Sequence, residues 1–526
     1  MKTKNLLFTA MASIVFIASA QAQNVNIPDA YFKAALVGNA SINTNMDAEI
    51  QITEANSYSG SINVAGAGIA NLTGIEAFGL LDSLDCSHNQ LSGLNLSSNT
   101  VLTYLDCSFN HLAALDVSAC TSITTLNCSH NYEITSLDVS ANTSLTTLNC
   151  SHNHAITSLD VSANTLLTTL NCSCDYAITS LDVSANSLLT YLDCSSGYLT
   201  GGGWFPGQLT SLDLSSNAAL TYLNCHGNQL TSIDLFFNTV LTYLDCSNNL
   251  LAALNVSACT SLTTLNCYLN QLLGIDVSNN TTLVYLDCNN NQLTGIDLSG
   301  NTALVYLDCN NNQLISLNVS ANTSLANLNC SYNHPMTSLD VSANTLLTYL
   351  DCSGCVVWDS GSWSESQLAY LNVKNGNNIN MSDHSFFALC NPNLTCIEVD
   401  NASWSTTNWA GYTYLVELYL PGDPSTSYTE EWFQGNTDAQ SFFSENCSGV
   451  GITDNNETKA PMFYPNPTTG TIYLSEPANI TLSDLSGKLL LEEENTNQLD
   501  LSALPVGMYF LNIGENNQQI VKVVKE

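Results

Sequence analysis

The sequence of 526 residues contains eight Lys and Arg residues against 45 Asp and Glu, a formal net charge of −37 at pH 7. No Lys or Arg occurs between Lys33 and Lys374. Because contacts to phosphate depend on cationic side chains, nucleic acid is excluded as a partner and anionic membrane surfaces are disfavoured. The composition is compatible with cations and with partners that carry a cationic surface.

Residues 1–22 have the features of a secretory signal peptide. Lys2 and Lys4 precede an apolar run from Leu6 to Ala18, and Ala20 and Ala22 supply small residues for cleavage after either of them. No later segment is apolar for long enough to span a bilayer. We therefore expect an exported protein without a transmembrane segment.

Residues 23–61 are expected to cap the body that follows. Pro28–Val37 predicts a short amphipathic helix with Pro near its start. The next segment, 43–54, resembles an EF-hand or dockerin-type calcium loop, but it has Asn at position 1 and Ala48 where Gly is needed for the sharp turn. The alternative is a polar turn between cap and first strand. Calcium is the one cofactor indicated, with the ligands Asn43, Asn45, Asp47, Gln51 and Glu54.

Residues 62–376 consist of a repeat, whose clearest copy, Leu283–Ala303, reads LVYLDCNNNQLTGIDLSGNTA. Each unit is a nested pair, L-x-x-L-D-C-x-x-N followed by L-x-x-I-D-L-S-x-N, and both halves predict a short strand ended by an Asn turn. Neither half buries its apolar side alone, so stacking predicts a solenoid. The anchors, mostly 21 or 22 residues apart, are Leu81, Leu102, Ile123, Leu145, Leu167, Leu189, Leu220, Leu241, Leu262, Leu283, Leu304, Leu325 and Leu347.

This pattern resembles the leucine-rich repeats, in the short bacterial form known as the IRREKO type. The resemblance implies a leucine-rich-repeat β-solenoid. Together with the short N-terminal capping helix and a small C-terminal β-sandwich after the solenoid, it gives a chain that we expect to be mostly β. The resemblance also implies that the outward residues of each strand form a regular solvated sheet.

Thirteen of the 20 cysteines occupy one inward column of the repeat, so we interpret them as small buried hydrophobes with free thiols. Parallel Cβ vectors on neighbouring rungs make the disulfide dihedral angle unfavourable. Beyond the repeats, Cys396–Cys447 is the one disulfide that we expect. The column is Cys86, Cys107, Cys128, Cys150, Cys172, Cys194, Cys225, Cys246, Cys267, Cys288, Cys309, Cys330 and Cys352.

Two outward columns, one rich in Tyr and the next in Asp, predict a ligand-binding face. Tyr supplies rigid contact area and Asp accepts hydrogen bonds beside it, which suits a protein or a glycan. The alternative is that Tyr favours strands and Asp keeps the surface soluble. The face residues are Tyr222, Tyr243, Asp245, Tyr285, Asp287, Tyr306 and Asp308.

Two inserts interrupt the period, one at 200–208 with Trp204 and one at 356–367 with Trp358 and Trp363. Inserts on solenoids emerge as loops that often carry function, although tolerated slippage of the repeat is an equal alternative.

Two further columns of the repeat contain residues that could bind metal ions. His130, His152 and Cys174 fall on consecutive rungs, where they could share a metal or coincide by accident. A second acidic column predicts like-charge repulsion that divalent cations would relieve. Its members are Asp116, Asp138, Asp160, Asp182, Asp213, Asp234, Asp276, Asp297 and Asp340.

The C-terminal part divides into a cap of the solenoid at 377–447, with strands expected at 394–399 and 414–420, a polar linker at 448–461, and a separate domain at 462–526. The last resembles the type A sorting domain of the type IX (Por) secretion system, through Tyr464–Gly470, Asp484–Lys488, Leu504–Tyr509, Lys522 and Lys525. The resemblance implies a β-sandwich read by the outer-membrane translocon and then removed. The mature protein would be secreted by, or attached to the outer surface of, a Gram-negative bacterium.

The sequence contains no Gly-x-Ser-x-Gly elbow, no His-Glu-x-x-His motif and no phosphate loop, so we expect no enzymatic activity. We expect a monomeric surface or released protein that binds a protein or glycan, with adhesion as its role. One alternative is a structural surface or matrix component without a specific ligand. The other is an extracellular hydrolase that uses the Trp-bearing inserts.

Overall fold

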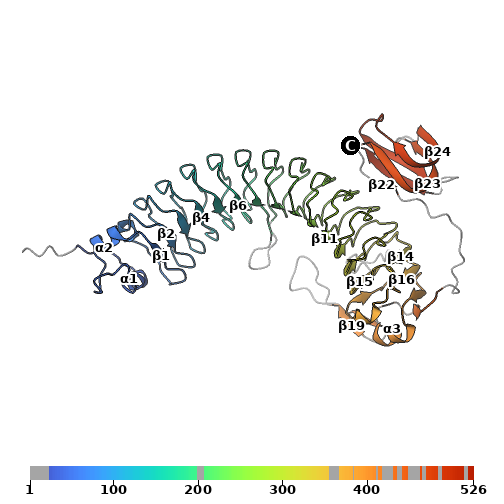
Figure 1. Ribbon diagram of the computed structural model, residues 1–526, viewed down its shortest axis with the longest axis horizontal. Coiled ribbons are helices and arrows are strands. Elements are labelled where there is room, and N and C mark those ends of the chain that lie inside the picture. The colour runs from blue at the N-terminus through green and yellow to red at the C-terminus, as the bar shows by residue number, and fades with distance from the viewer. Residues whose placement is uncertain are drawn as a thin grey trace, which may run out of the picture.

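The computed structural model describes most of the chain, and Figure 1 shows its course. The signal peptide, the linker at 448–461 and the three insert tryptophans, Trp204, Trp358 and Trp363, lie outside the described residues. In the described part, no helix is long and apolar enough to cross a membrane. The described residues are 23–197, 206–354, 366–382, 384–409, 413–416, 431–434, 437, 441–447, 463–464, 470–483, 488–513 and 519–525.

Two short helices cap the N-terminal end. The predicted helix is α1 (Ala30–Val37), which begins at Asp29 because that carboxylate accepts the N–H groups of Tyr31 and Phe32. Its buried residues are Phe32 and Leu36. A second helix, α2 (Ile52–Ser57), overlaps the segment for which a calcium loop is predicted, and a capping box starts it.

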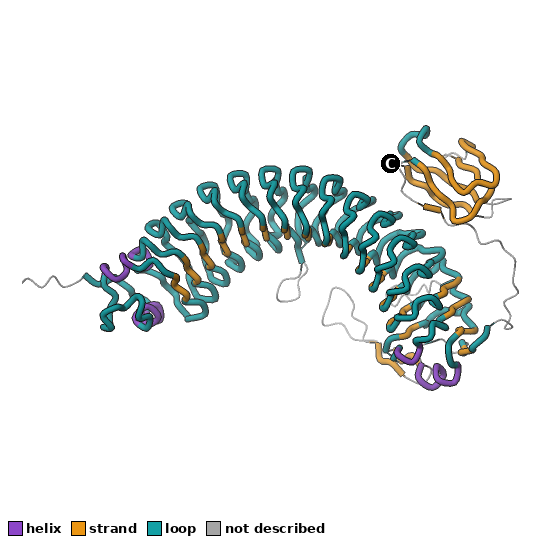
Figure 2. The backbone as a smooth tube through the Cα atoms, viewed as in Figure 1, coloured by secondary structure: helices purple, strands orange, loops and turns teal. Residues whose placement is uncertain are grey.

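The repeats form a parallel sheet with one strand per rung. Each strand except the last has three residues, of which the middle one is a buried Leu on nearly every rung, and equivalent positions pair between neighbours. Figure 2 shows these strands along the inner, concave side of the curved solenoid. Among the described residues the sheet has 15 strands. They are β1 (Ser61–Asn63), β2 (Ser83–Asp85), β3 (Tyr104–Asp106), β4 (Thr125–Asn127), β5 (Thr147–Asn149), β6 (Thr169–Asn171), β7 (Tyr191–Asp193), β8 (Tyr222–Asn224), β9 (Tyr243–Asp245), β10 (Thr264–Asn266), β11 (Tyr285–Asp287), β12 (Tyr306–Asp308), β13 (Asn327–Asn329), β15 (Tyr349–Asp351) and β17 (Phe386–Phe387).

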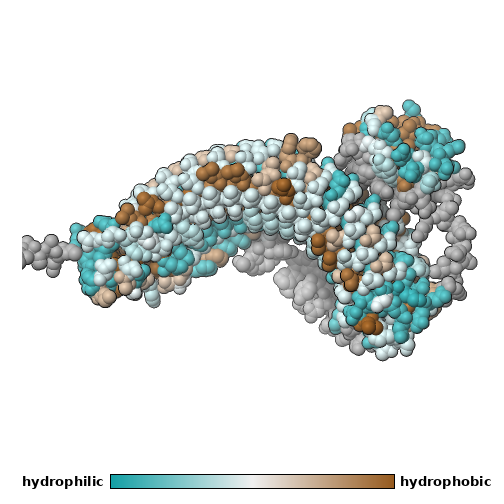
Figure 3. Space-filling view, in the orientation of Figure 1, coloured by the Kyte–Doolittle hydropathy of each residue, from teal (hydrophilic) through white to brown (hydrophobic). Residues whose placement is uncertain are grey.

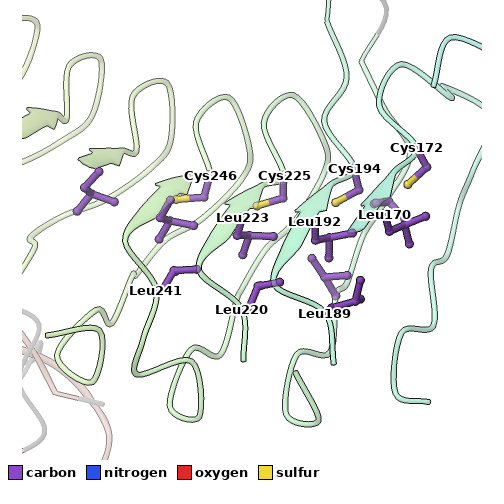
Figure 4. Close-up of a cluster of buried hydrophobic side chains, with 14 of the residues drawn as sticks. Leu170, Cys172, Leu189, Leu192, Cys194, Leu220, Leu223, Cys225, Leu241 and Cys246 are labelled. Atoms are coloured by element: carbon purple, nitrogen blue, oxygen red, sulfur yellow. The ribbon is translucent and has the colours of Figure 1, made fainter. Parts of the chain in front are cut away.

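The core of the solenoid is a continuous seam of Leu and Cys. Leu192 and Cys194 of one rung lie beside Leu223 and Cys225 of the next (Figure 4). All thirteen cysteines of the column are free and buried, as predicted. Burial raises the pKa of the Cys194 thiol well above its ordinary value, so the column is protonated and unreactive in the folded protein.

Columns of buried Asn tie the rungs together at both turns. In the first turn Asn110 donates from Nδ2 to the carbonyl of Cys86 at 3.0 Å, and its Oδ1 accepts the N–H of Leu91 at 2.9 Å. In the second turn Asn186 donates to the carbonyl of Asn164 at 2.9 Å. These amides replace the backbone hydrogen bonds that the turns lack.

A second parallel sheet forms at the C-terminal end, from β14 (Ser338–Asp340), β16 (Tyr370–Asn372), β18 (Cys396–Glu398) and β21 (Phe442–Ser444). Helix α3 (Ala402–Trp409) closes the core because the Trp409 ring stacks on Phe386, with centroids 4.3 Å apart. Two short 3-10 helices lie at Ile75–Ala77 and Asn378–Asn380, and β19 (Thr413–Val416) pairs with β20 (Glu431–Gln434). Strands β18 and β19 overlap the two strands predicted for this region.

The expected disulfide joins Cys396 to Cys447, with Cα atoms 5.9 Å apart. Cys390 is disulfide-bonded as well, which the sequence analysis missed. The single-disulfide expectation was therefore wrong, because the search for pairs beyond the repeats left out Cys390.

The C-terminal domain has its own core and one antiparallel sheet. The strands are β22 (Phe463–Tyr464), β23 (Thr471–Ser483), β24 (Leu489–Asp500), β25 (Gly507–Ile513) and β26 (Gln519–Lys525). A β-sandwich was expected here, whereas the described strands of this domain form a single sheet. In this sheet β23 pairs with both β24 and β25, and the strands enclose one core. Register shifts along β23 and β24 let that sheet curl.

Candidate ligand-binding face

The predicted Tyr residues of the concave face form stacks along the solenoid. The ring of Tyr222 lies parallel to Tyr191 at 4.3 Å and to Tyr243 at 4.4 Å, measured between centroids. Tyr285 and Tyr306 form a second stack at 4.3 Å. The rung of β10, which carries Thr264 at this position, separates the two stacks.

Stacking decides which part of each Tyr a ligand can reach. Tyr222 has a ring on both sides, so its aromatic faces are covered and only its edge and hydroxyl remain for contact. Burial and, as the second cause, the charge of the neighbouring Asp351 raise the pKa of Tyr349 to about 12. Tyr349 is the last member of the column. The column is thus a row of protonated hydroxyl groups.

The Asp column lies beside the Tyr column, at the third position of each strand. Asp245 accepts the N–H of Ser247 at 3.0 Å and the Nδ2 of Asn266, on the next strand, at 3.2 Å. Where two Asp are neighbours, no such amide separates them: Asp287 pairs in register with Asp308. Burial and the charge of Asp308 raise the pKa of Asp287 to about 7.

Between Lys33 and Lys374 the chain has no Lys or Arg that could offset these carboxylates. Burial also raises the pKa of Asp193, Asp308 and Asp351. The face therefore combines hydroxyl donors with carboxylates that are costly to ionise, and a cationic group placed beside them would stabilise their charged form.

The five predicted calcium ligands come together, but as a hydrogen-bonded turn. Asn45 donates to Asp47 at 2.9 Å and to Gln51 at 2.8 Å, and Gln51 donates to Asp47 at 2.9 Å. Glu54 accepts the N–H groups of Thr44 at 2.8 Å and of Gln51 at 3.0 Å. A calcium ion would have to displace these donors.

The amide oxygen of Asn43, the remaining predicted ligand, is buried without a hydrogen-bond partner among the described residues. Burial alone would raise the pKa of Glu54, yet hydrogen bonds from Gln51, Thr44 and Asn45 lower it. The side-chain oxygens of the other four predicted ligands all accept hydrogen bonds within the turn. Calcium binding stays a prediction, which melting of the parent and of Asp47→Asn with calcium and with chelator would test.

His130 and His152 belong to a ladder of rings that the sequence analysis did not foresee. His88, Phe109, His130 and His152 stack on successive rungs with centroids 4.2, 3.9 and 4.1 Å apart. The lone pairs of stacked imidazoles point in parallel and do not converge on one ion. Within the described residues, no group of three or more His, Cys, Asp or Glu suits a metal.

Each residue of this ladder occupies the same turn position, where the backbone has a positive φ. Burial and the neighbouring His152 lower the pKa of His130 to about 4, so His130 is uncharged at neutral pH. A search for ring residues at one turn position of consecutive repeats would have found it.

In the second acidic column, the described carboxylates are capped locally. Asp116 accepts both the N–H and the hydroxyl of Ser118, at 3.0 and 2.6 Å. Hydrogen bonds of this kind lower the pKa of Asp116 and Asp138. These side chains are fully exposed and stay ionised at neutral pH.

Comparisons with known proteins agree with this architecture. Residues 462–526 match the secretion system C-terminal sorting domain. The functional domain of InlJ from Listeria monocytogenes, described as including a cysteine ladder, is 29% identical, with a TM-score of 0.54 over 96% of this chain and 98% of that one. No curated protein matches the sequence.

Two further solved structures are similar over much of their length. The internalin InlF of Listeria monocytogenes is 19% identical, with a TM-score of 0.47 over 73% of this chain and 99% of that one. A leucine-rich-repeat protein of Leptospira interrogans is 18% identical, with a TM-score of 0.47 over 66% of this chain and 91% of that one.

The fold and the domain match define the class: the chain is a leucine-rich-repeat β-solenoid protein with internalin-like structural neighbours. Its C-terminal sorting domain assigns it to type IX secretion, across the outer membrane to the cell surface or the medium.

Proposed function

We propose that the concave face, formed by the outward residues of β2–β13 and β15, binds a protein partner outside the cell, with adhesion as its role. The observation that carries this proposal is the row of stacked Tyr beside a row of Asp, on a stretch of solenoid that has no Lys or Arg before Lys374. Tyr supplies large, rigid contact area at low entropic cost, as in other protein-binding surfaces.

The stacking favours a protein over a glycan. Sugars contact aromatic side chains through the ring face, and the face of Tyr222 is covered on both sides. A protein surface can instead accept hydrogen bonds from the hydroxyl row while its own cations approach Asp287 and Asp308. Lys- and Arg-bearing partners are therefore the class that this face fits.

Affinity capture from surface-protein extracts with the mature chain, residues 23–526, tests the proposal. The variant Asp287→Asn/Asp308→Asn and the variant Tyr222→Ala/Tyr243→Ala should each lose the captured partner. Asp138→Asn, in the second acidic column, is the matched control and should retain it. A partner held equally by all variants would favour a structural role, and a hit on a glycan array that depends on Tyr222 would favour a glycan.

We also propose that the translocon reads residues 462–526 and that this domain is then removed, with the cut falling in the linker at 448–461. The solenoid and the sorting domain have separate hydrophobic cores, which supports cleavage between them without loss of either fold. Mass spectrometry of the exported protein should find a C-terminus within that linker.

A further inference from the structure

Exposed apolar side chains occur at several places on the solenoid, including one stretch of the second turn where apolar residues occupy four consecutive rungs. At the position two residues after the turn Asn, four consecutive rungs carry Leu166, Leu188, Ala219 and Val240. The rungs on either side carry Ser144 and Ser261 there. The run is therefore bounded by polar residues at both ends. Figure 3 shows several patches of hydrophobic residues (brown) on a solenoid surface that is otherwise mostly pale, of intermediate hydropathy.

The turn hydrogen bonds place these side chains side by side. Asn186 donates to the carbonyl of Asn164, Asn217 to that of Asn186 and Asn238 to that of Asn217, at 2.9, 3.0 and 2.9 Å. Since each apolar residue follows its Asn at the same distance along the chain, the four form a continuous row across the rungs.

Two phenylalanines extend the row on its last rung. Phe236 and Phe237 replace the Ser and Ala that neighbouring rungs carry in this turn, and their side chains are 67% and 51% exposed. Leu166 and Leu188 are 47% and 48% exposed. Leaving such side chains in water is unfavourable, and a contiguous exposed group of this kind marks an interaction surface. The apolar row comprises Leu166, Leu188, Ala219, Val240, Phe236 and Phe237.

A row of exposed carboxylates borders the apolar row. Asp234 accepts the N–H of Phe236 at 3.0 Å, which places its charge directly beside the aromatic pair. On the preceding rungs Asp160, Asp182 and Asp213 occupy the same position, and they are exposed and fully accessible to a partner. No Lys or Arg occurs between Lys33 and Lys374 to offset them.

We propose that the apolar row is a docking surface for a cationic amphipathic segment of another protein. Apolar side chains of the segment would cover Leu188, Val240 and Phe237, while its Lys or Arg would pair with Asp182, Asp213 and Asp234. A second copy of this chain would bring an equal row of carboxylates, and anionic lipid would be repelled. The site lies at the turn before the strands, separate from the concave face, so either surface can function without the other.

The probe for a test is a fluorescent peptide of about 18 residues in which Leu at i, i+3, i+4 and i+7 faces one side and Lys the other. A scrambled Leu/Lys peptide and a Leu/Glu peptide of the same apolar pattern are the controls. Binding to the mature chain is measured by fluorescence anisotropy at several salt concentrations.

The test variant is Leu166→Ser/Leu188→Ser/Phe236→Ser/Phe237→Ala, which introduces the residues that other rungs carry at these positions and so should preserve the fold. It should bind the amphipathic Lys peptide about tenfold or more weakly. Leu346→Ser is the matched control, because Leu346 occupies the same column at 57% exposure but lies away from the apolar row, and it should bind like the parent.

A charge variant, Asp182→Asn/Asp213→Asn, should weaken binding about threefold and reduce its dependence on salt, whereas Asp297→Asn should not. Equal binding by parent and test variant would overturn the proposal, as would equal binding of the scrambled peptide. Sedimentation showing a dimer of the parent that the test variant loses would also overturn it, in favour of a second copy as occupant.

Discussion

Asp175 is the residue that departs most from the chemistry of its column. The equivalent Asn153 donates from Nδ2 to the carbonyls of Cys128 and Cys150, at 3.1 and 2.7 Å. Asp175 accepts the N–H of Asn153 at 2.7 Å, but an ionised carboxylate has no proton to donate in return. Burial raises the pKa of Asp175 well above its ordinary value, so the folded protein holds it protonated.

Replacing Asp175 by Asn should therefore stabilise the protein, and more so as pH rises. With a raised folded-state pKa, the parent loses stability once the unfolded chain ionises while the folded chain does not. Above neutral pH the gain should be about 1–3 kcal/mol. Urea unfolding at pH 5 and pH 8 measures it, and an equal gain at both pH values would show that Asp175 is ionised in the fold.

Asp287 provides a second pH-dependent test, on the concave face. Its pKa is raised to about 7, so the parent should lose stability between about pH 4 and pH 7, and Asp287→Asn should remove that loss. Asn already occupies this position on β8 and β10, so the fold accommodates it. Asp138→Asn should show the opposite trend, because the pKa of Asp138 is lowered.

Single rungs show why the Cys column need not form disulfides outside the cell. Each Cys fills one small site between two Leu-bearing rungs, and burial raises the pKa of thiols such as Cys225 and Cys267 well above the ordinary value. Exchange with external disulfides requires an accessible thiolate, and the column offers neither accessibility nor ionisation. The fold itself protects these thiols.

A thiol assay follows directly. The thiols of native, unreduced protein should react slowly with a chromogenic disulfide reagent. In denaturant, at least the thirteen thiols of the column should react. A denatured count far below thirteen would mean that neighbouring rungs are cross-linked. Cys225→Ala should cost about 1–2 kcal/mol through the cavity that it leaves, as seen by urea unfolding.

At the scale of the whole molecule, the net negative charge affects the stability of the fold. A formal charge of −37 is spread along a solenoid whose rungs hold each acidic column in register. Repulsion within these columns opposes folding, and hydrogen-bonded Asn and Ser side chains between the carboxylates reduce it only locally.

Screening should therefore stabilise the protein. Raising the NaCl concentration from about 10 mM to about 150 mM should increase Tm by several degrees, and choline chloride should do the same. A measurement in calcium chloride at the same ionic strength distinguishes screening from binding. A Tm higher than in NaCl would support binding of divalent cations to the acidic columns or to residues 43–54. A Tm that is insensitive to NaCl would contradict the repulsion.

The sorting domain carries the last prediction at this scale. Deleting residues 462–526 should leave the solenoid folded, since its core is separate, but should retain the protein in the periplasm. Fractionation followed by immunoblotting of the solenoid checks the result. Surface display of the deleted form would show that another part of the chain directs export.

The sequence by itself determined the repeat, the strand on each rung, the buried Cys column and the identity of the last domain. The first three depend on local periodicity, and a period of 21 or 22 residues leaves little choice of register, whereas the last domain was recognised from short motifs. Leu192, Cys194 and Tyr191 could be assigned to inward and outward columns because strand residues alternate.

Only the tertiary structure decided what happens between rungs. The parallel stacking of Tyr222 on Tyr191, across the insert that separates them in sequence, depends on neighbouring strands meeting in register. The raised pKa of Asp287 and Asp175 depends on burial by other rungs, and the start of α2 depends on the capping box between Gln51 and Glu54. Burial and electrostatics are sums over neighbours distant in the chain, and a linear pattern does not contain those sums.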